Sequence, residues 1–420
     1  MPSHTQASGH NHALVVLTSL FFMMGFITCL NDILVPHLKE VFTLSYVQAM
    51  LVQFCFFGAY AIMSIPASKF IIKLGYKNGV IGGFLIAAVG CLLFYPAASS
   101  KLYPLFLFAL FILATGVTLL QVSGNPYVTL LSKPGKESST LTLVQAFNSL
   151  GTTIAPLLGS VFILAAVVKT PAEQAALDAS ALATYQAEQA ASVQMPYLAL
   201  AAVLVVLAVA VALIRLPKAE QVQTDSSHSL NDGKTSVWQY KHLVLGALGI
   251  FCYVGAEVGI GSLLVNVMGL PEVAGLNHQS AARYLAMYWG GAMVGRFIGS
   301  AVMSKIAPNV YLAFNALMNV LLIALAMTLG GHAAMWCLLA IGFFNSIMFP
   351  TIFSLAVNKL GRFTSAGSGV ICTAIVGGAI MPVVQGFFAD HIGLMLSFIV
   401  PALCYVYIVY FGLKGHKVQV

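Results

Sequence analysis

The chain has 420 residues, of which 60% are hydrophobic and 7% are charged. Soluble domains carry about 25% charged residues, so this composition excludes a soluble protein and predicts a helical membrane protein with several spans. The net charge of +7 would suggest nucleic-acid binding in a soluble protein, but here it reflects charges in loops, and we expect no nucleic-acid partner.

Hydropathy predicts twelve membrane-spanning helices, six on each side of a polar stretch. The alternation of apolar and polar residues that is typical of outer-membrane β-barrels is absent. The apolar run that follows residues 1–12 is longer than a signal-peptide core, so we expect no cleavage. The twelve predicted spans cover residues 13–36, 47–68, 78–98, 103–131, 140–168, 195–215, 241–266, 281–302, 309–329, 333–358, 367–388 and 392–413.

Residues 216–240 are rich in charged residues, Ser and Gln, and this composition is typical of a solvated linker. We therefore predict an N-terminal six-helix half at 1–215, a cytoplasmic linker at 216–240 and a C-terminal six-helix half at 241–420. If both termini lie in the cytoplasm, most of the 19 Lys and Arg residues fall in cytoplasmic segments. Cytoplasmic loops carry an excess of Lys and Arg, so the charge distribution supports this orientation. The basic residues predicted outside are Lys39, Lys101, Lys169 and Arg283.

The two halves resemble each other at several positions. The fifth span contains Gly151-Thr-Thr-Ile154-Ala-Pro156, and the eleventh contains Gly377-Gly-Ala-Ile380-Met-Pro382, with Gly, Ile and Pro at equal spacing. Two six-helix halves with weak internal similarity are typical of transporters of the major facilitator type. The sequence therefore predicts an all-α membrane protein with the major facilitator fold and 12 transmembrane helices in two six-helix halves.

Asp32 lies inside the first apolar span. A carboxylate at the centre of a spanning helix costs about 2.5–3.5 kcal/mol on insertion scales, so it needs a functional or structural reason. Gly25, Thr28 and Cys29 share its helical face at spacings of three, four and seven residues, which indicates that Asp32 points inward. We interpret Asp32 as a binding or cation-coupling residue, with a structural aspartate that bonds a neighbouring helix as the alternative. Glu257, the other carboxylate deep in a span, is a second coupling candidate or a helix-bridging group.

Polar and aromatic side chains inside the spans predict where a solute would bind. Amides donate and accept hydrogen bonds at once, which suits vicinal hydroxyls, and aromatic rings stack on the apolar faces of pyranoses. The alternative is hydrogen bonding between helices, which Asn, Gln, Ser and Thr commonly supply. The pattern favours a neutral polyhydroxylated solute. The candidate substrate-binding residues are Asn31, Asp32, Gln53, Gln121, Asn125, Gln145, Asn148, Asn266, Tyr288, Trp289 and Asn345.

Four stretches resemble the fucose–galactose–hexose:cation symporter family of the major facilitator superfamily. They are Asn31-Asp32-Ile-Leu-Val-Pro36, Gly124-Asn125-Pro126-Tyr-Val, Gln145-Ala-Phe-Asn148-Ser-Leu-Gly151 and Phe349-Pro350-Thr-Ile-Phe-Ser354. Gly255-Ala-Glu257-Val-Gly259 is most similar to the bacterial glucose/galactose transporters within it. The resemblance implies cation-coupled uptake of a monosaccharide across the bacterial inner membrane by alternating access. It also implies that the first, fourth, seventh and tenth spans line a central cavity.

Transferred position by position, the resemblance identifies Asp32 with the protonatable aspartate of the family. Gln145 and Asn148 match polar cavity positions. The chain departs from the family at Gln121, where the fucose permease has a glutamate. Because an amide cannot exchange a proton, the departure argues against coupling through Gln121 and favours glucose or galactose over L-fucose.

The coupled cation is left open between H⁺ and Na⁺, and we expect no other cofactor and no metal site. Asp32 could take up a proton, or ionised Asp32 and Glu257 could hold Na⁺ with amide oxygens. We expect a monomer in the lipid bilayer and no enzymatic activity, since the His residues are scattered without ligand spacing. The alternatives are a transporter of N-acetylglucosamine or L-fucose in the same family and, from another class, a membrane sugar sensor that does not transport.

Overall fold

The computed structural model describes residues 14–27, 46–100, 102–162, 176–178, 180–182, 184–185, 194–214 and 235–418. Over these residues the secondary structure is helical, with no strand. The chain forms two compact units, the first from 1–124 and 147–217 and the second from 125–146 and 218–420. The predicted division at 1–215, 216–240 and 241–420 stays a prediction.

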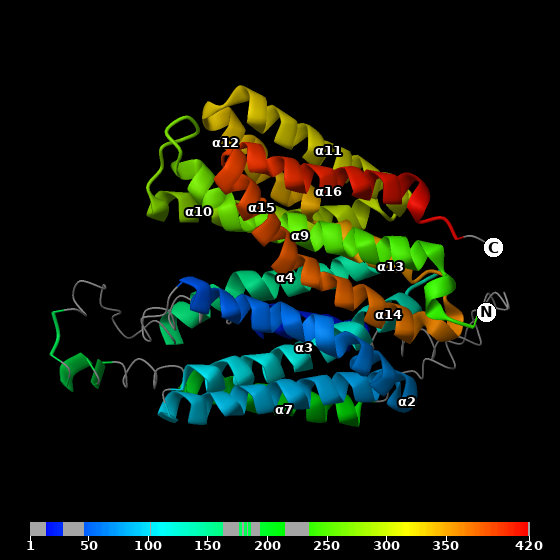
Figure 1. Cartoon of the computed structure of the whole chain (residues 1–420). Helices are drawn as coiled ribbons and strands as arrows, with labels where there is room; N and C mark the ends of the chain where they lie inside the picture. The colour runs from blue at the N-terminus through cyan, green and yellow to red at the C-terminus, as the bar shows by residue number, and fades with distance from the viewer. Residues whose placement is uncertain are drawn as a thin grey trace. The chain divides into compact units, whose positions relative to one another are not determined.

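The first unit contains the helix Leu14–Ile27 and four longer helices or parts of them (Figure 1). α2 runs through two predicted spans and is interrupted at Gly75, whose φ of 81° lies in the left-handed region that glycine adopts without strain. α2 packs against α7. Lys77 strengthens this contact, because its Nζ donates to the carbonyl oxygens of Ala212 and Ile214 at 2.8 Å each and so satisfies free groups at the end of α7. The helices are α2 (Tyr46–Ser100), α3 (Tyr103–Leu131), α4 (Glu137–Phe162) and α7 (Gln194–Leu213), with the end of α3 and the start of α4 in the second unit.

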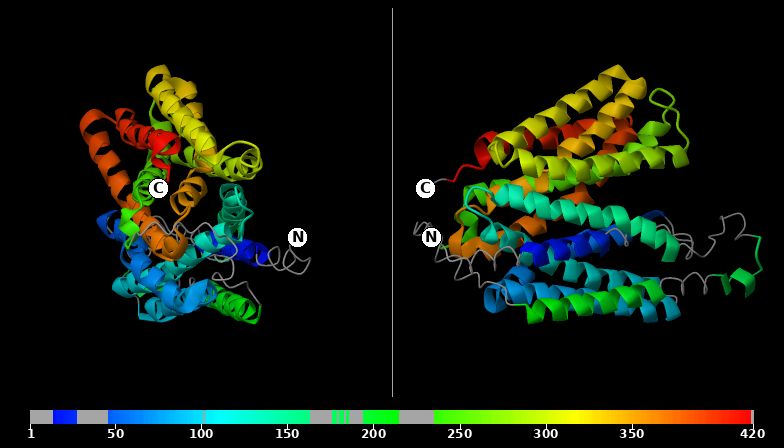
Figure 2. Two further views of the ribbon diagram at one scale, coloured as in Figure 1. Left: turned by 90° about the vertical axis from the view of Figure 1, so that its right-hand side faces the viewer. Right: turned by 180° about the vertical axis from the view of Figure 1, so that it is seen from behind.

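The second unit is built around α9, which contacts α10, α13, α15 and α16 (Figures 1 and 2). The predicted tenth span is divided into two helices, α12 and α13, and the predicted eleventh into α14, the short η3 and α15. The short η1 (Val237–Gln239) precedes α9. The helices are α9 (Lys241–Gly269), α10 (His278–Val302), α11 (Pro308–Leu329), α12 (Gly331–Asn345), α13 (Met348–Ala356), α14 (Thr364–Thr373), η3 (Ala374–Val376), α15 (Gly377–Ile392) and α16 (Ile399–Tyr410).

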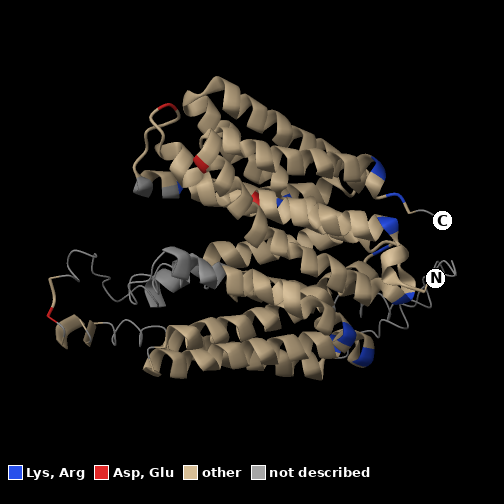
Figure 3. Ribbon diagram, viewed as in Figure 1, with Lys and Arg blue, Asp and Glu red and all other residues tan. Residues whose placement is uncertain are grey.

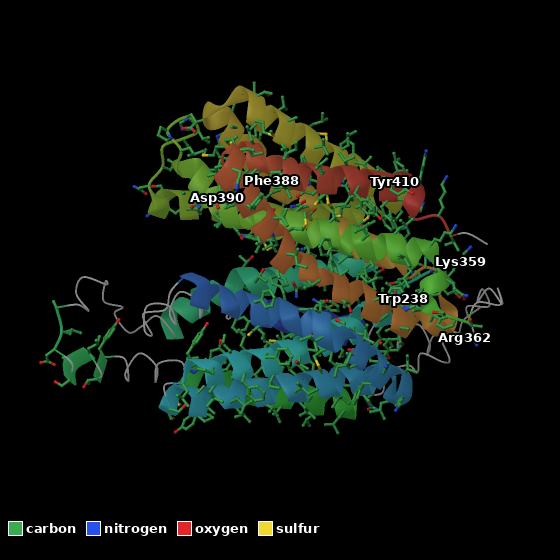
Figure 4. All side chains as sticks on the ribbon, viewed as in Figure 1. Trp238, Lys359, Arg362, Phe388, Asp390 and Tyr410 are labelled. Atoms are coloured by element: carbon green, nitrogen blue, oxygen red, sulfur yellow. The ribbon has the colours of Figure 1, made fainter. Side chains whose placement is uncertain are left out.

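By length and composition, eight helices in the described part of the chain can cross a membrane. The first of them, Phe54–Ser100, covers most of the predicted span 47–68 and all of the predicted span 78–98. Leu14–Ile27, α4 and α10 correspond to the remaining predicted spans, but they are shorter or less apolar. In the second unit, basic residues gather at the end where α9 begins (Figure 3), and Figure 4 shows Lys359 and Arg362 there and Asp390 at the other end.

Glycines allow close helix contacts in the second unit. A Cβ at Gly342 of α12 would lie 2.1 Å from the carbonyl oxygen of Tyr288 in α10, and a Cβ at Gly377 would lie 2.1 Å from that of Phe251 in α9. Because the obstacles are backbone atoms, a side chain can be accommodated only if a helix moves. Small residues at such crossings are typical of membrane helix packing.

We expect Gly342→Ala to lower the free energy of unfolding by about 1–3 kcal/mol, the usual cost of overpacking a close contact. Gly386→Ala in α15 is the matched control, because a Cβ there meets nothing within 4 Å, and the gain in helix propensity should stabilise by about 0.5–1 kcal/mol. Thermal unfolding of the purified protein in detergent measures both. Equal midpoints for the two variants would contradict the close approach of α10 and α12.

Candidate functional site

A buried hydrogen-bond network in the second unit centres on Asn345, the last residue of α12. Its Oδ1 accepts from Asn319 Nδ2 at 2.8 Å and from the Tyr405 hydroxyl at 2.7 Å. Its Nδ2 donates to the Tyr288 hydroxyl at 2.9 Å. All four side chains are buried. The network therefore joins α10, α11, α12 and α16 through one amide.

The network continues to Glu257 in the middle of α9. The Tyr288 hydroxyl accepts from Asn345 and donates to the carbonyl oxygen of Glu257 at 3.3 Å. The Glu257 carboxylate interacts electrostatically with the guanidinium of Arg296 and with Tyr253, which lies one helical turn earlier on the same face. Glu257 is partly exposed. The Glu257 carboxylate therefore interacts with the guanidinium of Arg296 and with tyrosine side chains.

Arg296 also holds the break between α12 and α13. Its Nε donates to the carbonyl oxygen of Ser346 at 3.1 Å, and its Nη1 donates to the carbonyl oxygen of Gln145 at 3.4 Å. A helix break frees backbone carbonyls, which in a membrane must find new donors. The guanidinium supplies such donors and keeps a basic side chain close to Glu257.

The start of α4 and the end of α3 are joined by another amide pair. Gln145 Nε2 donates to Asn125 Oδ1 at 3.1 Å, and both side chains are buried. Four residues before Asn125, Gln121 is partly exposed on α3. Asn125 and Gln145 therefore bond each other between two helices, which was the alternative to sugar binding for these amides.

In the first unit, Asn148 lies against the helix Leu14–Ile27. Its Nδ2 donates to the carbonyl oxygen of Phe21 at 2.9 Å. A Cβ at Gly151 would lie 2.1 Å from the carbonyl oxygen of Phe22, so the two helices are in backbone contact. This contact fixes the helix that precedes Asp32 in the chain. Asn31 and Asp32 themselves lie outside the described residues.

Three other predicted residues are not part of these contacts. Asn266 is exposed and lies nine residues after Glu257, which places it on the opposite face of α9. Trp289 is 45% exposed, and its ring is perpendicular to that of Tyr288 at a centroid distance of 5.0 Å. Gln53 belongs to α2, but its side chain lies outside the described set.

Three residues of these contacts were not among the predicted site residues, namely Tyr253, Asn319 and Tyr405. The sequence could have indicated Tyr253, because it lies four residues before Glu257 on the same helical face. It could also have indicated Asn319, as an amide inside a strongly apolar span. It could not have indicated Tyr405, because a tyrosine fits an apolar span without a cost that hydropathy detects. Among the described residues, no group of three or more His, Cys, Asp or Glu could hold a metal ion.

The chain is similar to known transporters along nearly its whole length. Residues 16–375 match the Major Facilitator Superfamily. The chain is similar to the glucose/galactose transporter of Brucella abortus biovar 1 (strain 9-941), with 55% identity over 99% of this chain and 98% of the relative. It is also similar to the L-fucose-proton symporter of Escherichia coli (strain K12), with 36% identity over 94% of this chain and 91% of the relative.

The fold is similar to the crystal structure of the E. coli fucose:proton symporter, with a TM-score of 0.88 and 32% identity over 98% of this chain and 100% of that chain. These similarities confirm the predicted fold class and the predicted family resemblance. Because the relatives are named as transporters, they also confirm the prediction that the chain is not an enzyme.

Proposed function

The chain belongs to the Major Facilitator Superfamily, and on this premise we propose that it imports a glucose- or galactose-type hexose with a coupled cation by alternating access. The observation that carries the proposal is the 55% identity over nearly the whole length to a protein named glucose/galactose transporter. The symporter name of the E. coli relative supports cation coupling.

The polar side chains within the spans support a hydroxyl-rich solute. Amides, tyrosine hydroxyls and a carboxylate offer both donors and acceptors, which a hexose needs at each hydroxyl. Asn345 and Tyr288 are buried and already bonded to each other, so their role is to position α10 and α12. Gln121 and Trp289 keep exposed surface and are better suited to direct contact with the sugar.

L-fucose is the second substrate candidate, because the chain is 36% identical to a protein named L-fucose-proton symporter. Gln121 argues against it, since the fucose permease has a glutamate at that position. N-acetylglucosamine is a third candidate on family grounds. A counterflow assay in proteoliposomes with radiolabelled D-glucose and a panel of competing sugars tests this ranking of the candidate substrates.

We expect D-glucose and D-galactose to compete most strongly in this assay, and L-fucose and N-acetylglucosamine weakly. Strong competition by L-fucose alone would overturn the hexose assignment. The absence of counterflow with every sugar, in a protein that still binds them, would favour the sensor that does not transport.

The proposed location is the bacterial inner membrane, with both termini in the cytoplasm and the chain acting as a monomer. The bacterial source of the relatives supports the membrane. The excess of Lys and Arg in segments that would then be cytoplasmic supports the orientation.

The proposed coupling residues are Asp32 and Glu257, with H⁺ and Na⁺ as the candidate cations. We expect Glu257→Gln to reduce uphill accumulation of the sugar while counterflow continues, because the amide keeps the shape of the side chain but loses its charge. Repeating the assay with and without Na⁺ and with a protonophore identifies the ion. Undiminished accumulation by this variant would limit Glu257 to a structural role beside Arg296.

A further inference from the structure

The basic end of the second unit carries a side-chain cluster that the proposed transport cycle does not use. Two segments meet there, residues 235–245 at η1 and the start of α9, and residues 356–366 between α13 and α14. They contain Lys241, Lys359 and Arg362 and no Asp or Glu. The three basic side chains are exposed. Figure 4 shows Lys359, Arg362 and Trp238 at this same end.

Specific contacts join the two segments. The buried Tyr240 ring lies 5.9 Å from the His242 ring and 5.8 Å from the Phe363 ring, measured between centroids. The Nε2 atom of His242 lies 2.9 Å from the carbonyl oxygen of Asn358. The residues next to Lys359 and Arg362 are therefore packed against the start of α9, and the basic side chains project from a fixed base.

Arg362 packs on an aromatic ring, and Lys359 has an unusual backbone conformation. The Arg362 guanidinium carbon lies 4.9 Å from the centroid of the Phe363 ring, a cation–π distance. Lys359 has a φ of 56°, which is uncommon for a residue other than glycine. Backbone strain of this kind gathers at functional sites, and here it lies in the turn that presents the charges.

Trp238 adds an apolar ring to this charged end. Its side chain is 59% exposed, although the turn that carries it is well ordered by its caps. Gln239 Oε1 accepts from the backbone N–H groups of Thr235 at 2.9 Å and Ser236 at 3.2 Å, and the Ser236 hydroxyl accepts from the Trp238 N–H at 3.4 Å. The exposed ring is thus presented by a capped turn.

The cluster lies where two membrane spans begin. The candidate spans start at Lys241 and at Gly361, so Trp238, Lys359 and Arg362 are within a few residues of the membrane–water boundary. Tryptophan is enriched at this level, where one part of the ring meets acyl chains and the N–H meets water. An excess of basic residues in cytoplasmic loops explains the charges alone, but it does not explain a capped, exposed tryptophan beside them.

We propose that this cluster binds the headgroup of an anionic phospholipid, with Lys241, Lys359 and Arg362 around the phosphate and Trp238 at the level of the glycerol. Arginine and lysine are the usual partners of phosphate oxygens. Basic residues close to an anionic membrane surface each contribute about 1 kcal/mol of attraction, which corresponds to about a five-fold preference for the anionic lipid.

Tryptophan fluorescence can test the site directly. The chain has three tryptophans, so the double variant W289F/W336F leaves Trp238 as the only one. This protein is reconstituted into phosphatidylcholine nanodiscs that contain equal mole fractions of brominated phosphatidylglycerol or brominated phosphatidylcholine, and bromine quenches the ring only when the labelled lipid is next to it.

We expect stronger quenching of Trp238 by the brominated phosphatidylglycerol. Adding K359Q and R362Q should lower the preference by about five-fold for each charge removed. R362K should keep it, since the charge remains. The matched control is K305Q, which removes an exposed lysine at the α10–α11 connection and should leave the preference unchanged.

Three results would overturn the proposal. Equal quenching by the two brominated lipids would show that the lipid next to Trp238 is not selected by its headgroup charge. If K305Q and K359Q/R362Q lost the preference for phosphatidylglycerol equally, the preference would reflect the general positive charge of this end of the unit and not a site at Trp238. Displacement of phosphatidylglycerol by millimolar inorganic phosphate at constant ionic strength would show a site for soluble anions.

Discussion

Asp32→Asn is expected to abolish uphill accumulation of the sugar and to leave counterflow exchange in place. The asparagine has nearly the same shape and can still bond a sugar hydroxyl, but it can neither carry a proton nor neutralise Na⁺. Without the coupled charge, the membrane potential no longer acts on the transport step, and this potential is worth about 2.3 kcal/mol per charge at 100 mV. Tracer uptake into proteoliposomes under an imposed ion gradient measures the loss.

Gln121→Ala is the matched comparison for this prediction. It removes a candidate sugar contact that cannot carry a proton, so it should weaken apparent affinity while accumulation at saturating sugar persists. Full accumulation by Asp32→Asn would exclude Asp32 as the coupling group.

Asn345→Ala is expected to give the largest loss of stability among the variants considered. It removes the acceptor of two buried donors, Asn319 Nδ2 and the Tyr405 hydroxyl, and a buried donor without a partner costs about 1–3 kcal/mol. It also removes the donor to Tyr288. The expected result is a clear decrease of the thermal midpoint, measured by unfolding in detergent.

Asn315→Ala supplies the control for this result. Asn315 is equally buried in α11 and donates to the carbonyl oxygen of Tyr311 within its own helix, at 2.8 Å. Its loss should cost about 0.5–1.5 kcal/mol, the net value of one ordinary hydrogen bond. Equal decreases for the two variants would contradict the view that Asn345 joins four helices.

Hydropathy predicted the helices well because lipid imposes long apolar segments with internally bonded backbones. It could not predict the break between Asn345 and Met348. Pro350 has no N–H to donate to the carbonyl oxygen of Ser346 four residues earlier, and this carbonyl accepts instead from Arg296, a residue fifty positions earlier. Asn345, Ser346 and Pro350 mark this place in the sequence, but hydropathy averaged over a whole span does not locate a break within it.

Part of the candidate site was predictable because polar and charged side chains are costly inside a membrane span. Glu257 is conspicuous in the sequence because a carboxylate is expensive in a span. Asn345 was equally visible as an amide, but its type alone could not distinguish a sugar ligand from a residue that joins helices. The three hydrogen bonds to Asn319, Tyr405 and Tyr288 make that distinction. Asn266 shows the opposite case, since it is a visible amide that lies on the outer face of α9.

Cation-coupled hexose import by this chain is tested by the accumulation of radiolabelled D-glucose and D-galactose in proteoliposomes under an imposed inward cation gradient. We expect an internal concentration above the external one, collapse of the excess when an ionophore for the driving ion dissipates the gradient, and inward movement of that cation when sugar is added. Simple equilibration of sugar across the membrane, unchanged by every H⁺ or Na⁺ gradient, would contradict cation-coupled import.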